Sequence, residues 1–160
     1  MKFSSQEEYG LRCLLEIARS APGVSMTISE ISEAEGLSQA YVAKLLRILR
    51  LSGFVESVRG QEGGYILAQP EDSMFIADIL AALGGRFYKP GFCDHFSGSV
   101  DTCAHTLSCS IRPLWHRVQT AIDEVLGKTT LADLLDEEPQ GPQKARELHK
   151  NPLIQIADNV

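Results

Sequence analysis

Two short capped helices that flank one glycine constrain the fold of this chain more than any other feature. Thr27, with Glu30 three residues later, predicts a capping box that opens the first helix, and Gly36 predicts its end. Ser38 then predicts the start of a second helix, which we expect to continue to Gly53. Two helices of this size joined by a glycine-containing turn predict a helix-turn-helix.

The second of these helices is expected to have one apolar face and one basic face. Small side chains on the basic face allow close approach to a DNA groove, and cations there can reach phosphates. A solvated face without any partner is the alternative interpretation. The apolar stripe consists of Val42, Leu45, Leu46 and Leu49, and the basic face of Ala40, Ala43, Lys44 and Arg47.

Residues 54–68 predict a β-hairpin, because two short β-rich segments, 54–58 and 65–68, flank a glycine-rich turn. A helix-turn-helix followed by a hairpin is a winged helix, so this segment favours DNA binding over a solvated face. Arg59 lies at the predicted tip of the wing, where a guanidinium suits a narrow, electronegative minor groove. A simple surface charge at a turn is the alternative for Arg59.

Helical periodicity and capping signals predict four more helices. The first covers residues 5–19 and places Cys13 on its apolar side, where a free cysteine is a small core residue rather than a ligand. The others are expected over residues 74–83, over 111–126, and from Thr129 or Thr130 to Leu135.

The helix predicted over residues 111–126 is strongly one-sided. A long amphipathic helix beyond a small DNA-binding core predicts a dimerisation helix, and packing back onto its own domain is the alternative. The apolar stripe consists of Ile111, Leu114, Val118, Ala121, Ile122 and Val125, and the polar side of Arg112, His116, Gln119, Asp123 and Glu124.

Three cysteines lie close together just before this helix. Cys93, Cys103 and Cys109 fall within seventeen residues that also contain His95 and His105. Thiolates and imidazoles bind soft or borderline metals and iron–sulfur clusters. The surrounding loop of about 27 residues has little periodicity, and a loop that long usually has a ligand or a function. The sequence therefore predicts a metal or redox site here.

Composition and charge exclude several other classes of protein. The net charge of −6 argues against a generally basic nucleic-acid coat. Residues 1–67 carry seven Lys and Arg against eight Asp and Glu, whereas residues 71–138 carry five against eleven, so a DNA-binding face needs locally clustered cations. We see no membrane span, no signal peptide and no cofactor loop or catalytic triad, so we expect a non-enzymatic protein of the reducing cytosol.

Taken together, the chain resembles the winged-helix bacterial regulators that include the iron–sulfur-cluster-assembly regulator IscR and the nitric-oxide sensor NsrR. The resemblance covers residues 1–138, and the order and spacing of its motifs make it specific. Besides the three cysteines, it is carried by residues 1–5, 8–12, 37–46, 57–65, 112–115 and 129–134.

The resemblance implies a cytoplasmic homodimer whose long C-terminal helices pair and whose two winged helices read a near-palindromic DNA operator. Operator affinity would be switched by a 2Fe-2S or 4Fe-4S iron–sulfur cluster that senses iron–sulfur status, redox state or nitric oxide. The cluster would be held by the three cysteines of the loop. The implied DNA contacts are Ser38, Gln39, Tyr41 and Arg59, which join Lys44 and Arg47 of the basic face.

Two departures from the family leave the fourth cluster ligand open. In the cluster-assembly regulator five residues separate each pair of neighbouring cysteines, whereas here nine and then five do; and Arg112 replaces the histidine that follows the last cysteine. Glu8 matches the acidic residue that the nitric-oxide sensor donates from the partner subunit. An exposed carboxylate stabilised by the helix dipole is the alternative for Glu8. His105 and His95 are competing ligands.

These inferences define the expected fold class and domains. The fold is mainly α with a small β-hairpin: a winged helix-turn-helix domain plus a long C-terminal dimerisation helix. The alternative function is a winged-helix regulator with a zinc or thiol-based redox switch and no cluster. The expected domains are a winged-helix DNA-binding domain (1–83), an iron–sulfur cluster loop (84–112), a dimerisation helix with a C-terminal helix (113–138), and a flexible tail (139–160).

Overall fold

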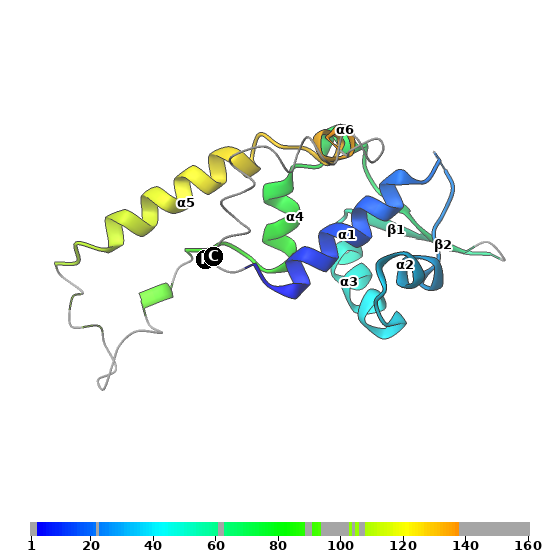
Figure 1. Cartoon of the computed structure of the whole chain (residues 1–160), viewed down its shortest axis with the longest axis horizontal. Helices are drawn as coiled ribbons and strands as arrows, with labels where there is room; N and C mark the ends of the chain where they lie inside the picture. Colours follow the sequence, from blue (N-terminus) through cyan, green and yellow to red (C-terminus); the bar gives the residue numbers. More distant parts are fainter. Residues whose placement is uncertain are drawn as a thin grey trace, which may run out of the picture.

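The computed structural model describes residues 3–21, 23–60, 63–88, 91–93, 103, 105 and 108–137. In this part of the chain, the helices are joined by one two-stranded sheet that projects to one side of them, which confirms the expected winged-helix fold class (Figure 1). The elements are α1 (Ser5–Arg19), α2 (Ile28–Glu35), α3 (Gln39–Leu51), β1 (Val55–Val58), β2 (Gly64–Leu67), a 3-10 helix (Glu71–Ser73), α4 (Ile76–Leu83), α5 (Arg112–Leu126) and α6 (Leu131–Asp136).

Side-chain caps set the start of the helix-turn-helix elements. Thr27 and Glu30 form the predicted capping box at α2, and Gly36 ends that helix in the left-handed conformation with φ of 64°. The Ser38 side chain accepts a hydrogen bond from the backbone N–H of Tyr41 and so caps α3. The predicted helix-turn-helix is therefore present.

The hairpin is docked onto the segment that precedes α2. Met26 and Tyr65 exchange two backbone hydrogen bonds, of 3.0 Å and 2.8 Å, and form an antiparallel bridge. The close approach requires a residue without a side chain at Gly64, where an added Cβ would lie 2.5 Å from the Met26 carbonyl oxygen. The wing is thus fixed to the helix-turn-helix near the turn of the hairpin, where Gly64 pairs with Val58.

The core collects the apolar faces of α1 to α4 together with β1 and α6. Cys13 is fully buried in this core, and burial raises the pKa of its thiol to about 12. This agrees with the prediction that Cys13 is a core residue. The fully buried larger side chains are Leu14, Ile31, Val42, Leu45, Leu46, Leu49, Val55, Met74, Ile79, Leu83 and Leu131.

The C-terminal helix α6 returns to this core. Thr130, rather than Thr129, caps α6, and it forms an antiparallel bridge with Phe75 just before α4. Leu131 donates its N–H to the Met74 carbonyl at 2.9 Å and is itself fully buried. The winged-helix core therefore includes a residue that follows the long helix. The domain boundaries given above remain predictions.

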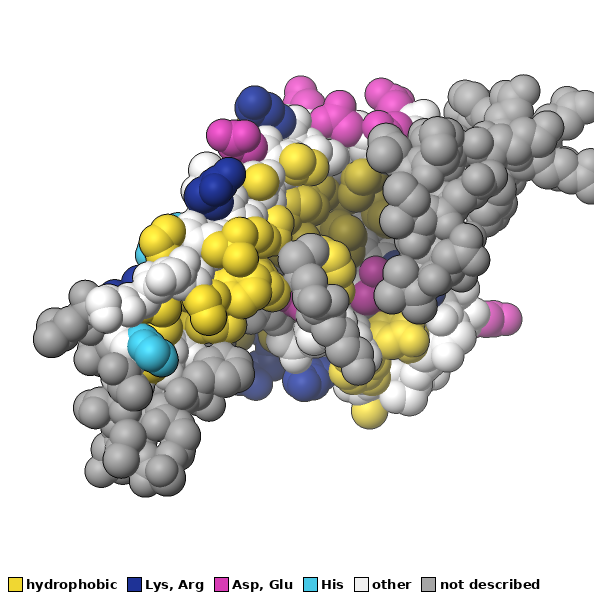
Figure 2. All heavy atoms as spheres, turned by 60° about the vertical axis from the view of Figure 1, so that its left-hand side comes forward, with side chains coloured by type: hydrophobic (Ala, Val, Ile, Leu, Met, Phe, Trp, Pro, Cys, Tyr) yellow, Lys and Arg dark blue, Asp and Glu magenta, His cyan; other side chains and the backbone are white. Residues whose placement is uncertain are grey.

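The long helix α5 extends away from the other helices and keeps much of its apolar stripe in solvent (Figure 1). Ile111, Leu114 and Val125 are 57%, 49% and 65% exposed. Figure 2 shows hydrophobic side chains gathered in a band on the face that α5 brings forward. Among the described residues of α5, Gln119 is the buried one, although periodicity places it on the polar side. Val118 and Ile122 of the same stripe are half-buried, so its own chain covers the stripe only in part.

Two predictions lie outside the described residues: His95 and the tail over residues 139–160. No helix in the described part of the chain is both long and apolar enough to cross a bilayer.

Candidate DNA-binding surface and thiol site

The N-terminal end of α3 presents the predicted base-reading residues. Ser38 and Gln39 are exposed, and the Gln39 amide donates a 3.3 Å hydrogen bond to the Ser29 hydroxyl on α2. Tyr41 is half-buried and meets the ring of Tyr9 edge-on, with centroids 6.1 Å apart. Ser38 and Gln39 are thus available to DNA, whereas Tyr41 also supports the contact between α1 and α3.

The predicted basic face of α3 is exposed. The Lys44 ammonium lies 5.9 Å from the centroid of the Tyr41 ring, and Arg47 lies one turn further along the helix. Arg50 continues the row, a position that sequence analysis missed although it follows Arg47 by three residues. No described carboxylate forms an ion pair with any of these cations, so they remain available to phosphates.

Arg59 follows β1 at the tip of the wing and is exposed. It lines a groove of about 840 Å³ between the wing and the start of α2, together with Val24 and Glu30. The Met26–Tyr65 bridge joins the wing to the segment before α2, and α3, which carries the basic face, packs against both α2 and β1. This arrangement supplies a helix for a major groove and a guanidinium for a minor groove.

The three predicted cluster cysteines are half-buried free thiols. The sulfur of Cys109 accepts a 3.3 Å hydrogen bond from the backbone N–H of Arg112, the first residue of α5. This hydrogen bond places the sulfur of Cys109 at the N-terminus of α5. Among the described residues, no three His, Cys, Asp or Glu side chains are gathered as a metal site, so the structure does not bring all three cysteines into one group.

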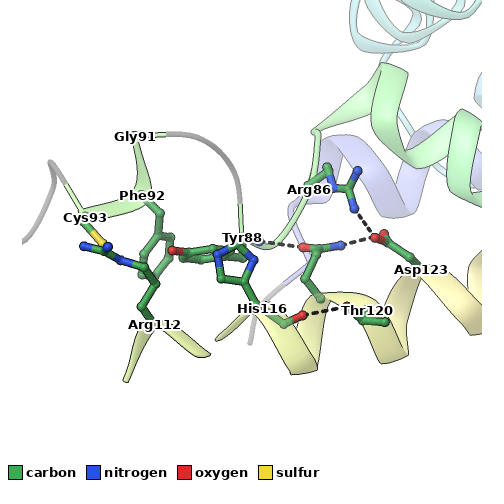
Figure 3. A pocket seen from close by; sticks show the side chains of 10 residues that line it. Arg86, Tyr88, Gly91, Phe92, Cys93, Arg112, His116, Thr120 and Asp123 are labelled. Carbon is green, nitrogen blue, oxygen red and sulfur yellow. Dashed lines mark hydrogen bonds and ion pairs between the residues drawn. The ribbon is translucent and has the colours of Figure 1, made fainter. Parts of the chain in front are cut away.

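Cys93 lies in a pocket of about 540 Å³ between the loop and α5 (Figure 3). Tyr88, Arg112 and His116 line the same pocket. The pKa of Tyr88 is raised, first by desolvation and then by the charge of Cys93 and a hydrogen bond to it; Cys109 contributes in the same direction. Cys93 and Cys109 therefore both raise the pKa of the Tyr88 phenol.

The first residues of the loop are fastened to α5 through a buried amide. Gln119 accepts a 2.7 Å hydrogen bond from the backbone N–H of Tyr88 and donates one of 2.8 Å to Asp123. Asp123 in turn pairs with Arg86. Neither Tyr88 nor Gln119 is among the site residues predicted from the sequence. The only signal for Tyr88 is its place five residues before a cysteine, and periodicity assigned Gln119 to the polar side.

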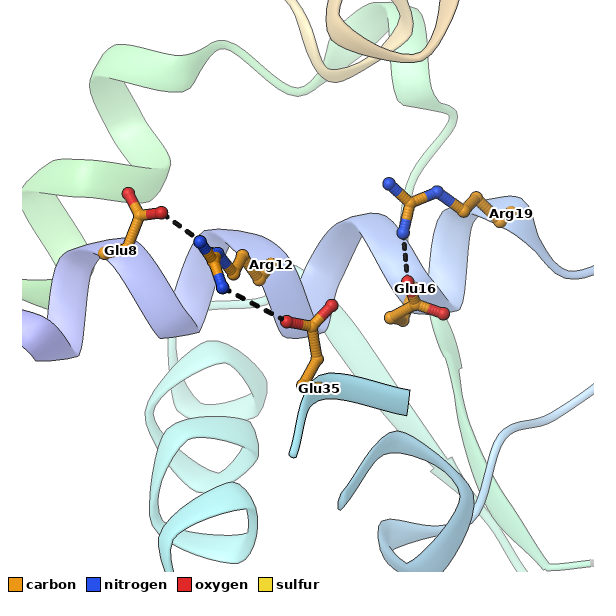
Figure 4. Close-up of polar contacts among 5 residues, drawn as sticks. All are labelled: Glu8, Arg12, Glu16, Arg19 and Glu35. Carbon is orange, nitrogen blue, oxygen red and sulfur yellow. Dashed lines mark hydrogen bonds and ion pairs between the residues drawn. The ribbon is translucent and has the colours of Figure 1, made fainter. Parts of the chain in front are cut away.

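The predicted fourth ligand, Glu8, is exposed on α1. Its carboxylate pairs with Arg12 at 3.0 Å, and the same guanidinium lies 3.9 Å from the Glu35 carboxylate at the end of α2 (Figure 4). His105 is also exposed. Neither residue joins the cysteines in a metal-binding group within the described part of the chain.

Comparisons with known proteins agree with this architecture. The family described as "Rrf2: Iron-dependent Transcriptional regulator" matches residues 3–137. The chain belongs to the Rrf2 family. One relative is the protein rrf2 of Nitratidesulfovibrio vulgaris strain Hildenborough, which is 32% identical over 145 residues that cover 91% of this chain and 94% of the relative.

Solved structures of similar proteins share the fold. T. potens IscR is 32% identical, with a TM-score of 0.70 over 89% of this chain and 93% of that chain. CymR, the global cysteine regulator of B. subtilis, is 29% identical, with a TM-score of 0.64 over 84% of this chain and 95% of that chain. Members of this Rrf2 family are transcription regulators rather than enzymes, so this chain is a DNA-binding transcription regulator.

Proposed function

We propose that this Rrf2-family protein is a cytoplasmic homodimer whose affinity for a near-palindromic operator is switched by an iron–sulfur cluster, 2Fe-2S or 4Fe-4S. The signal would be iron–sulfur status, redox state or nitric oxide. One observation carries the proposal: three half-buried free thiols lie on the segment that leads into a helix with an exposed apolar stripe.

The donor chemistry of this segment fits an iron–sulfur cluster. Cys93, Cys103 and Cys109 would hold it, because cysteine sulfurs are its usual ligands and the sulfur of Cys109 lies at the N-terminus of α5. When bound, the cluster would supply iron that reacts with oxidants and nitric oxide. Glu8 of the partner subunit would be the fourth ligand. A carboxylate is harder than a thiolate and is held more weakly beside soft ligands.

The exposed stripe of α5 supports dimerisation. Large apolar side chains left in solvent along one helix mark an interaction surface, and a second copy of α5 offers a matching stripe. Leu114→Gln should therefore lower the fraction of dimer in analytical ultracentrifugation. Arg117→Gln, an exposed change on the same helix, is the matched control. Equal dimer fractions in the two variants would refute pairing through this stripe.

Arg12 supports a connection between the proposed ligand and the DNA-reading unit. One guanidinium contacts both Glu8 on α1 and Glu35, which directly precedes the turn glycine Gly36 of the helix-turn-helix. A change in the charge or position of Glu8 therefore changes the electrostatic field at the turn. Such a contact can contribute to switching only if the two states bind DNA with different affinities.

On the DNA side, Ser38, Gln39 and Tyr41 would face base edges in the major groove. Lys44 and Arg47 would contact phosphates, and Arg59 would enter the minor groove. The exposure of both cation-bearing elements supports these roles.

The decisive experiment is purification without oxygen, followed by iron and sulfide analysis and a visible spectrum. We expect iron, sulfide and visible absorption in the wild type and their loss in Cys93→Ser, Cys103→Ser and Cys109→Ser. Cys13→Ser is the matched control. The Cys13 sulfur is buried in the core, so its replacement should leave the iron content unchanged. Loss of iron in Cys13→Ser with retention in Cys103→Ser would overturn the ligand assignment.

The fourth ligand is tested separately. Glu8→Ala should give a labile cluster, while His105→Ala and His95→Ala should change little. If His105→Ala strips the cluster and Glu8→Ala leaves its lifetime unchanged, ligation lies wholly within the loop.

A zinc or thiol switch without a cluster is the second candidate. The similarity to CymR, a cysteine regulator, supports it, and a structure of Staphylococcus aureus CymR in an oxidized form is also similar to this chain, at 29% identity with a TM-score of 0.66. Zinc and free thiols do not absorb visible light. A colourless anaerobic preparation would therefore replace the first proposal with this one.

A further inference from the structure

We propose that Gln119 and Tyr88 are positioning residues that fasten the start of the cysteine loop to α5 and direct the Tyr88 hydroxyl to a position where it can donate to the sulfur of Cys93. The expected effect of the Tyr88 hydroxyl on a bound cluster rests on the proposed function, because it requires Cys93 to be a ligand. The attachment of the loop to α5, which is the mechanical role, does not rest on the proposed function.

The first support is the burial of Gln119. Its side chain is the buried one among the described residues of a helix that otherwise exposes apolar groups. A buried amide is destabilising unless both of its ends have partners. Here both ends do: the oxygen accepts from the backbone N–H of Tyr88 at 2.7 Å, and the nitrogen donates to Asp123 at 2.8 Å.

A second attachment lies one helical turn further along α5. Asp123 receives the Gln119 amide on one oxygen and pairs with Arg86 through the other. The stretch from Arg86 to Tyr88 is therefore held at two neighbouring points of one helix. Two attachments a turn apart restrict both the position and the direction in which the loop leaves α4.

The ring of Tyr88 carries this restriction to the thiol. The ring lies edge-on to His116 of α5, with centroids 4.7 Å apart, and 5.1 Å from Phe92, the residue before Cys93. Figure 3 shows the Tyr88 hydroxyl directed towards the side of the pocket that holds Cys93 and Arg112.

The hydroxyl has an expected electronic effect. Hydrogen bonds to ligand sulfurs raise the reduction potential of an iron–sulfur cluster, because they withdraw charge from the sulfur. Tyr88→Phe removes the hydroxyl and keeps the ring contacts with His116 and Phe92. The cluster of this variant should form with wild-type iron content and show a more negative reduction potential.

Tyr65→Phe is the matched control for the potential. Tyr65 lies on β2, and its removed hydroxyl should leave the potential unchanged. An unchanged potential in Tyr88→Phe, in a protein that does bind a cluster, would overturn the hydrogen-bonding role. A wild type without a cluster would instead contradict the proposed function and leave the next experiment to decide the mechanical role.

The mechanical role is tested in cluster-free protein by alkylation with iodoacetamide, mapped by mass spectrometry. Gln119→Leu keeps the size of the side chain and removes both hydrogen bonds. Cys93 should then react several-fold faster than in the wild type, because the loop detaches from α5. Thr120→Val is the control: its hydroxyl bonds only to the His116 carbonyl of its own helix, among the described contacts. If Cys93 is alkylated at the wild-type rate in Gln119→Leu, the proposed attachment of the loop to α5 is wrong.

Cys13 serves as the internal probe of folding in every sample, because it is fully buried in the winged-helix core. If Cys13 also becomes reactive in Gln119→Leu, the core has unfolded. The decision then passes to Tyr88→Phe, in which an unaltered Cys93 rate together with an unaltered potential would overturn the proposal.

Discussion

The guanidinium Nε of Arg12 lies 3.0 Å from the Glu8 carboxylate, one turn earlier on α1. Another nitrogen of the same group lies 3.9 Å from Glu35, whose side chain is only 11% exposed. Surface ion pairs of this kind contribute at most about 1 kcal/mol to stability. The arrangement therefore matters less for stability than for the connection it makes, because one cation joins the first helix to the turn of the helix-turn-helix.

Replacement of Arg12 should uncouple DNA binding from the state of the thiol site. We expect Arg12→Gln to change the free energy of unfolding by less than about 1 kcal/mol, and to bring the operator affinities of cluster-loaded and cluster-free protein closer together. Fluorescence anisotropy with cluster-loaded and cluster-free protein measures the ratio of their operator affinities. Arg19→Gln, which alters a pair with Glu16 on the same helix, should leave the ratio as in the wild type. A wild-type ratio in Arg12→Gln would count against the connection.

Glu35 makes stability depend on pH in a defined direction. Its pKa is raised, first by desolvation and then by the nearby Glu16 carboxylate. The folded state therefore binds this proton more tightly than the unfolded state does, and the free energy of unfolding falls as pH rises above the ordinary glutamate pKa of about 4.3. Relative to the wild type, Glu35→Gln should gain stability between about pH 4 and pH 7. Urea unfolding of both proteins across this pH range tests the prediction. If the free energy of unfolding of Glu35→Gln minus that of the wild type stays constant or falls as pH rises, the prediction is wrong.

The basic face of α3 and the wing should differ in how they contribute to DNA binding. Lys44→Gln and Arg47→Gln should each lower the slope of log affinity against log salt by about one unit on any sequence, because each removes a phosphate contact. Arg59→Ala should instead weaken binding most at A·T-rich sites. Binding titrations at several salt concentrations on operators of different composition separate these effects. Unaltered operator binding by Arg59→Ala would remove the wing from recognition.

The wing should detach from the segment before α2 if a side chain is added at Gly64, next to the turn of the hairpin. In Gly64→Ala the new Cβ would lie 2.5 Å from the Met26 carbonyl oxygen, and a backbone atom cannot move aside as a flexible side chain can. We expect a loss of roughly 1–3 kcal/mol in the free energy of unfolding and weaker operator binding. Ser57→Ala, at an exposed position on β1, should be nearly neutral. Wild-type stability in Gly64→Ala would show that the two segments can separate without loss.

Local signals were sufficient for most of the winged helix. The Thr27–Glu30 box, Gly36 and Ser38 act through hydrogen bonds and backbone angles within a few residues, so sequence alone locates these helix ends. The predicted start of α4 was less accurate. The helix begins at Ile76 rather than Met74, because Met74 and Phe75 pair with the distant segment around Thr130.

The thiol site was harder to predict, for a physical reason. Periodicity shows which side chains share a face of α5, but not which face another segment covers; Gln119 is buried because the loop at Tyr88 happens to cross it. The order of the cysteines likewise carries no information on where an irregular loop places them. The proposed participation of a second copy adds contacts that no single chain contains.

The antiparallel bridge between Phe75 and Thr130 returns the chain to the winged-helix core after the loop and α5. The core helices α4 and α6 therefore lie on either side of this segment along the chain. A segment that both begins and ends at core elements can change in length and content while those elements keep their packing. The cysteine spacing, which differs from that of the cluster-assembly regulator, falls entirely within this segment, so the thiol site can diverge while the helix-turn-helix and the wing are retained.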